Sequence, residues 1–173
     1  MTASTGLRLR PLRIEDEDSF RAAHRAMLPE GFEFDWAFDE GTSWSAYLER
    51  LGDERIGRRL PPGIVPATFL VAEVGGRVVG RTSVRHVLND YLERFEGHIG
   101  YGVLAPYRRR GYATEILRQS LVIARSVGVG RVLVTCDEDN AGSAAVIEAN
   151  GGRLDNVVPT EPGRPAKRRY WID

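Results

Sequence analysis

The stretch from Tyr101 to Thr114 is the part of this sequence that most restricts the fold. Its first residues continue an apolar, strand-like run, Pro106 begins a turn, and Gly111 starts an amphipathic helix with small residues in its first turn. The first N–H groups of a helix have no partner within it and carry partial positive charge. Three consecutive arginines precede the glycine. The segment therefore predicts a pyrophosphate cradle built mainly from the main chain at a strand–turn–helix junction.

The rest of the chain alternates short strands and helices. Gly75-Gly76 between two apolar runs predicts a β-hairpin, and Asn140 is expected to cap a helix that Gly151-Gly152 ends. The expected helices are 14–28, a segment from Thr42 or Ser43 to about Leu51, 112–127 and 141–150; the expected strands are 7–10, 68–74, 77–87, 98–104, 131–136, 154–158 and 168–172. This order predicts one mixed α/β domain over residues 1–173.

Composition excludes several classes of protein. The 173 residues include 24 basic and 24 acidic ones, and this zero net charge argues against a nucleic-acid-binding protein. No run of 18 apolar residues exists and the polar N-terminus does not resemble a signal peptide, so we expect a soluble cytoplasmic protein without a membrane partner. The single cysteine, Cys136, excludes a disulfide framework, and three scattered histidines predict no metal site. The Walker and Rossmann glycine patterns are absent.

Residues 108–113, Arg-Arg-Arg-Gly-Tyr-Ala, match the pattern R-x-x-G-x-A. This resembles the acetyl-coenzyme A signature of the GCN5-related N-acetyltransferase (GNAT) superfamily. Val103 stands five residues before it, at the family spacing. Asn140 to Ser143 and Glu148 to Gly151 follow N-x-x-S and E-x-x-G, as in the branch that contains ribosomal-protein N-terminal acetyltransferases and in predicted bacterial acetyltransferases. The resemblance covers about residues 97–152.

The resemblance implies a GNAT fold of the α/β (α+β) class, with a mostly antiparallel sheet splayed in the middle and about four flanking helices. It implies that acetyl-CoA (coenzyme A) binds in the gap between strands 98–104 and 131–136, with no metal. Main-chain groups of Val103 and Ala105 would bond the pantetheine arm. The full set of implied cofactor-binding residues is Val103, Leu104, Ala105, Arg108, Arg109, Arg110, Gly111, Tyr112, Ala113, Thr114, Asn140 and Ser143.

The resemblance also implies transfer of an acetyl group to an amine, which needs a base and an acid. His98 stands where related enzymes carry a glutamate with a base role, so His98 is the expected base and Glu96 the fallback; the alternative for His98 is a strand histidine bonded to neighbouring backbone. The tyrosine that often acts as the acid is replaced by Ile147. Ser143 is the candidate acid, or a first-turn helix residue that bonds locally. Tyr101 and Tyr170 are other possible donors.

The acceptor is expected beside residues 29–43, where Phe34, Asp35 and Trp36 belong to an acidic, aromatic run that suits a cationic amine. The alternatives are that these aromatic side chains belong to the core or to a homodimer contact. His86 ends a strand on the expected acceptor side. The basic run 167–169 is best explained as an exposed strand edge protected by charge.

Three functions are open at this point. The first is acetyl-CoA-dependent N-acetylation of a primary amine of a small molecule. The second is acetylation of an N-terminal or lysine amine of a protein. The third is a non-catalytic acyl-CoA-binding module, which the missing tyrosine would explain. The sequence does not identify the amine.

Overall fold

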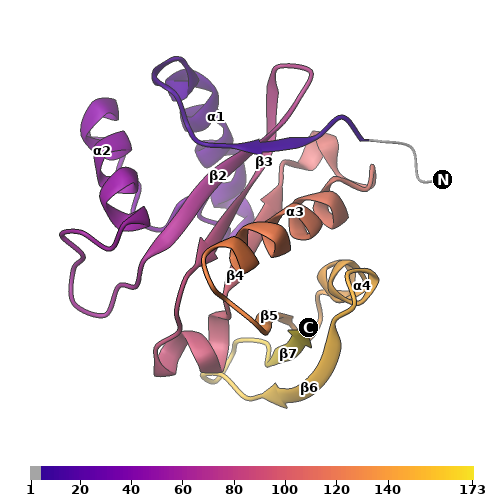
Figure 1. Ribbon diagram of the computed structural model, residues 1–173. Helices are drawn as coiled ribbons and strands as arrows, with labels where there is room; N and C mark the ends of the chain where they lie inside the picture. Colours follow the sequence, from indigo (N-terminus) through magenta and orange to yellow (C-terminus); the bar gives the residue numbers. More distant parts are fainter. Residues whose placement is uncertain (1–4) are drawn as a thin grey trace.

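The computed structural model describes residues 5–173, in which four α-helices surround two antiparallel sheets. Figure 1 shows their arrangement. The sheets have the strand orders β1-β2-β3-β4 and β5-β7-β6. The helices are α1 (Glu17–Met27), α2 (Trp44–Arg55), α3 (Tyr112–Ser126) and α4 (Ala141–Ala149), and the strands are β1 (Arg8–Arg10), β2 (Ala67–Val74), β3 (Arg77–Arg85), β4 (Ile99–Val103), β5 (Val132–Asp137), β6 (Arg153–Val158) and β7 (Lys167–Ile172). The predicted splayed sheet and flanking helices are confirmed.

Successive side chains of a strand point to opposite faces of the sheet. Because the strands of the four-stranded sheet have apolar residues on both faces, both faces are covered by helices. Val71 on β2 packs with Phe20 of α1 and Tyr47 of α2. The next residue, Ala72, faces the other way and packs with Ile116 of α3. In Figure 1, α1 and α2 accordingly lie on one side of β2 and β3, with α3 on the other.

The helix ends follow the local sequence. The Ser43 side chain accepts a hydrogen bond from the Ala46 N–H, and Asn140 Oδ1 accepts one from the Ser143 N–H at 3.0 Å. Both predicted caps are therefore present. Three short helical turns were not predicted from the sequence, namely the 3-10 turns Leu28–Glu30 and Ala105–Tyr107 and the π-helical turn Leu92–Glu96.

The prediction that the basic run 167–169 forms an exposed edge is wrong. This run begins β7, which lies between β5 and β6, so β6 forms the edge. Its charges are matched by the strands beside it: Lys167 Nζ lies 2.6 Å from Asp137 Oδ1, and Arg169 Nη1 lies 3.2 Å from Asp155 Oδ2.

Candidate functional site

The two sheets meet at one point and then separate. An isolated bridge joins Gly97 to Val134, and the His98 N–H donates to the Leu133 carbonyl at 2.7 Å. Beyond this junction, no strand pairs with the free edge of β4 in the described part of the chain. The gap between β4 and β5 that the family resemblance implied is therefore present.

The main chain of β4 directs polar groups into this gap. The Arg85 N–H donates to the His98 carbonyl at 2.7 Å, and the Leu104 N–H donates to the Val79 carbonyl at 2.9 Å. Antiparallel pairing alternates direction along the strand, so Tyr101 and Val103 point their N–H and C=O groups away from β3. These groups lie where an amide-containing arm could pair with β4 like an added strand.

The turn after β4 ends in a helix N-terminus without a side-chain cap. Arg109 and Gly111 both have positive φ, 63° and 78°, and the first bond of α3 joins the Glu115 N–H to the Gly111 carbonyl. The N–H groups at 112–114 thus have no partner within the helix. A Cβ built at Gly111 meets no atom within 4 Å. This open, donor-rich surface fits the diphosphate of coenzyme A.

The three arginines of the turn do not act alike. Arg108 Nε donates to the Val103 carbonyl at 2.9 Å, and its Nη2 lies 2.6 Å from Glu30 Oε2. Arg110 donates to the Pro106 carbonyl at 3.2 Å. The expectation that Arg108 adds charge for the phosphates conflicts with this ion pair, because its charge is matched and its guanidinium ties the end of β4 to the turn after α1.

The start of α4 forms the opposite wall. Asn140 Oδ1 accepts the capping hydrogen bond from the Ser143 N–H, so both groups are engaged in the helix cap. The Tyr101 hydroxyl reaches from β4 to the Ser143 carbonyl in a long hydrogen bond of 3.5 Å. Burial raises the pKa of Tyr101 to about 12, so this hydroxyl remains a proton donor at neutral pH.

His98 has the arrangement expected as the alternative to a base role, a strand histidine bonded to neighbouring backbone. It is only 8% exposed, and its Nδ1 accepts a hydrogen bond from the Leu133 N–H at 2.9 Å. Burial, helped by the positive charge of Arg85, lowers the pKa of His98 to about 4. The expectation of His98 as the base conflicts with this geometry, because the ring nitrogen that could take a proton already holds β4 to β5.

We expect His98 to make stability depend on pH. Its pKa is about 4 when folded and about 6.5 when unfolded, so its contribution is complete above pH 6.5 and is lost as the pH falls through 4. The loss amounts to at most about 3 kcal/mol. Urea unfolding between pH 4 and 7.5 measures it. His98→Asn, whose amide oxygen can still accept from Leu133, should give a flatter profile; an unchanged slope would contradict this role.

Glu96, the fallback base, lies beside a cavity. It ends the π-helical turn, and its Oε2 lies 3.6 Å from Arg85 Nη2. The cavity has a volume of about 250 Å³, and its walls include Tyr91, Phe95 and Lys167. Because Glu96 precedes the bridge at Gly97 directly, its partly exposed carboxylate stands next to the point where β4 and β5 meet.

The acidic, aromatic run 29–43 is divided between surface and core: most of it is exposed, but Phe34, Asp35 and Phe38 are buried. Phe34 is fully buried, and the Asp35 carboxylate accepts from the Tyr47 hydroxyl at 2.6 Å and from Arg50 at 3.0 Å. The proposed wall of Phe34 and Asp35 facing a cationic amine therefore conflicts with the structure, since both side chains are committed to the core. Trp36 is different: it is 53% exposed.

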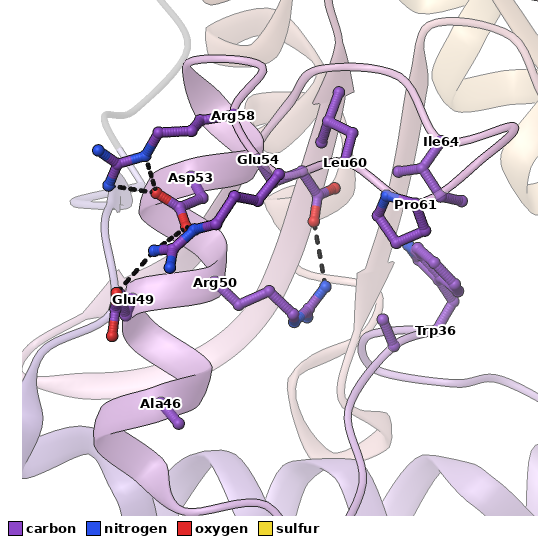
Figure 2. Close-up of a pocket in the computed structure, with 12 residues that line it drawn as sticks. Trp36, Ala46, Glu49, Arg50, Asp53, Glu54, Arg58, Leu60, Pro61 and Ile64 are labelled. Atoms are coloured by element: carbon purple, nitrogen blue, oxygen red, sulfur yellow. Dashed lines mark hydrogen bonds and ion pairs between the residues drawn. The ribbon is translucent and has the colours of Figure 1, made fainter.

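Two further side chains with shifted pKa values lie near this region, His86 and Glu54. His86 pairs with the Thr68 hydroxyl at 2.8 Å, and burial lowers its pKa. Glu54 of α2 lines a second and larger cavity together with Trp36 (Figure 2). Nothing in the sequence singles out Glu54 beyond its i,i+4 spacing from Arg50. Its burial depends on the segment after α2, so no local pattern signals it.

Residues 5–173 contain neither a metal-binding cluster nor a membrane-spanning helix. No group of three or more His, Cys, Asp or Glu side chains there could hold a metal ion. No helix in that range is long and apolar enough to cross a membrane.

Comparison with known proteins gives a consistent result. The family model described as an acetyltransferase (GNAT) domain matches residues 6–153. Nothing matched among curated proteins. RimJ of Mycobacterium smegmatis in complex with CoA-disulfide is 21% identical, with a TM-score of 0.70 over 96% of this chain and 81% of that one.

Two other solved structures are similar. Spermidine N-acetyltransferase of Vibrio cholerae in complex with CoA and spermine is 18% identical, with a TM-score of 0.66 over 98% of this chain and 96% of that one. The microcin C7 self immunity acetyltransferase MccE in complex with acetyl-CoA and AMP is 15% identical, with a TM-score of 0.67 over 98% and 93%. At these identities the likeness concerns the fold alone.

Proposed function

The chain belongs to the GNAT acetyltransferase family and is an N-acetyltransferase that depends on acetyl-CoA, and from this premise we propose that it acetylates a primary amine of a small molecule. One observation supports the acetyl-CoA dependence on which this proposal is built. The free edge of β4 and the uncapped start of α3 lie in succession along the chain, so that an extended arm and its diphosphate can be held by one continuous stretch of main chain.

When bound, acetyl-CoA supplies the acetyl group as a thioester. Residues 109–114 hold the diphosphate through main-chain N–H groups, and Val103 bonds the arm from the edge of β4. Leu104 and Ala105 begin the turn beside it. Arg108 positions the end of β4, as its bond to the Val103 carbonyl supports. Asn140 and Ser143 line the other wall at the start of α4.

The proton transfers are assigned to Glu96 and Tyr101. The Glu96 carboxylate accepts a proton from the ammonium group of the acceptor, since it borders a cavity next to the junction of β4 and β5. The Tyr101 hydroxyl, which its raised pKa keeps protonated, can donate to the leaving sulfur. His98 positions the junction and takes no proton.

We expect Glu96→Gln to lower kcat by about 100-fold while the affinity for coenzyme A changes little, because loss of a general base typically costs this much. His98→Asn should keep most of the turnover. Steady-state thiol release with saturating substrates measures both. If His98→Asn lost as much kcat as Glu96→Gln, with both variants equally folded, the assignment of the base would be reversed.

The acceptor class is tested by thiol release from acetyl-CoA with a panel of small amines, peptides and aminoglycosides. Turnover with small amines supports the proposal. A response to peptides alone would assign the enzyme to protein N-terminal or lysine acetylation. Coenzyme A binding without thiol release on the whole panel would favour a non-catalytic module.

A further inference from the structure

A cavity of about 520 Å³ lies between α2, the segment 58–64 and the exposed ring of Trp36 (Figure 2). This volume is within the range of small-molecule sites. Trp36, Leu60, Pro61 and Ile64 form an apolar wall on one side, and Arg50 and Glu54 face it from α2. The cavity is thus suited to an apolar body that carries one polar group.

Glu54 is the polar group with an incomplete set of partners. It is 9% exposed, and its Oε2 accepts from Arg50 Nη1 at 3.1 Å. Within residues 5–173 no hydrogen bond to its Oε1 is observed. Arg50 also serves Asp35, which is 6% exposed, at 3.0 Å. The Arg50 guanidinium is therefore shared by the buried carboxylates of Glu54 and Asp35. A bound cation would supply a second positive charge beside them.

The other charges of the cavity are already matched. The two oxygens of Asp53 lie 2.5 Å from Arg58 and from Arg59, and Glu49 lies 2.7 Å from Arg59. These pairs stand at the mouth, where the arginine side chains are about 60% exposed. Burial, reinforced by the negative charge of Asp35, raises the pKa of Glu54 to about 7, as expected for a carboxylate that lacks a full counter-charge.

A second guanidinium, that of Arg85, also acts on Glu54 but is engaged elsewhere. Arg85 of β3 donates to the Gly97 carbonyl at 3.0 Å, next to the junction of β4 and β5. The same guanidinium is near enough to Glu54 to favour its charged form. The positive charge of Arg85 is shared with Glu96, whose Oε2 lies 3.6 Å from Arg85 Nη2, so it does not fully balance Glu54.

We infer that this cavity binds an organic ammonium ion on an apolar body, with Glu54 as its anionic partner and Trp36 as part of the apolar wall. This binding does not depend on the proposed function, because the cavity shares no lining residue with the one that Glu96 borders. Trp36 adds the face of its ring, which attracts cations.

Calorimetry without acetyl-CoA tests the site with 2-phenylethylamine as the probe. We expect 2-phenylethanol and 3-phenylpropionate, which match it in size but lack the positive charge, to bind at least about 10-fold more weakly. Glu54→Gln should weaken binding of the amine by about 10-fold or more. Glu49→Gln, which removes an exposed carboxylate from the same helix, is the matched control and should change affinity less than about 2-fold.

Binding of the probe should also depend on pH. Glu54 is ionised above pH 7 and protonated below it, so the affinity at pH 5.5 should be about 30-fold lower than at pH 8, and Glu54→Gln should remove most of this difference. The charged and titratable groups that face Glu54 are Arg50, Tyr47, Glu49 and Asp53 on α2, Asp35 before it, Arg58 and Arg59 after it, and Arg85 on β3.

The outcomes separate the two proposals. Equal affinity for the amine and the alcohol, or equal losses in Glu54→Gln and Glu49→Gln, would overturn the site. If Glu54→Gln does not fold, Trp36→Ala replaces an exposed side chain and should weaken binding about 10-fold; unchanged affinity there would also overturn it. Binding with no amine acetylated would contradict the proposed function and leave the site standing.

Discussion

Gly111→Val is expected to weaken coenzyme A binding by at least about 100-fold. Gly111 has a φ of 78°, which a β-branched residue adopts only with strain, and the change should cost about 1–3 kcal/mol of unfolding free energy. The larger effect is on binding. The added side chain would project into the open space at the start of α3, where nothing lies within 4 Å, and would occupy the place proposed for the diphosphate.

The matched control is Gly128→Val at the other end of the same helix. Gly128 also has a positive φ, 93°, and open space around its Cβ position. Both variants therefore carry a similar backbone penalty, while only Gly111 borders the proposed cradle. Calorimetric titration with coenzyme A, beside urea unfolding, separates the two effects. Equal affinities in the two variants would place the diphosphate elsewhere.

The parts of the site that the sequence predicted correctly depend on neighbours in the chain. The start of α3 follows from Gly111 and the apolar spacing after it, and the cap by Asn140 from a polar residue before a helix. Such features involve residues a few positions apart, so the local pattern contains all the information they need. The gap between β4 and β5 came from a family resemblance and not from the pattern itself.

The assignments that conflict with the geometry involve partners far apart in the sequence. His98 was the expected base because it stands where related enzymes carry a glutamate, but its Nδ1 accepts from the N–H of Leu133, 35 residues later, and its ring is buried. The acidic run 29–43 looked like a cation site, but Arg50 is bonded to Asp35 and Arg108 to Glu30. An acidic residue in a sequence does not show which arginine will form an ion pair with it in the folded chain.

Strand order shows the same limit. The basic residues of β7 suggested an edge, yet whether a strand lies at an edge depends on the other strands, and β6 pairs outside it. The cavity at Glu54 likewise needs the segment after α2 to fold back over the helix. Neither the strand order nor the position of the segment after α2 produces a periodic pattern of residues, so neither can be predicted from the sequence alone.

Gly97→Ala is expected to have the largest effect on stability, about 3–5 kcal/mol. Gly97 has a φ of 69° and a ψ of −168°, a combination essentially restricted to glycine. A Cβ there would lie 2.5 Å from the Leu133 carbonyl oxygen. The main chain of β5 must then move, and the bond from the His98 N–H to that same carbonyl would be broken. Urea unfolding measures the loss.

The control is Gly75→Ala in the β2–β3 turn, where φ is 55° and nothing lies within 4 Å of the Cβ position. That variant should lose only about 1 kcal/mol, the ordinary cost of a positive φ. Because the junction at Gly97 determines how far β4 and β5 separate, Gly97→Ala should also weaken coenzyme A binding, and hydrogen exchange at the Leu133 amide should become faster. A Gly97→Ala protein as stable as Gly75→Ala, with that amide still protected, would show that the junction tolerates a side chain and does not hold the gap.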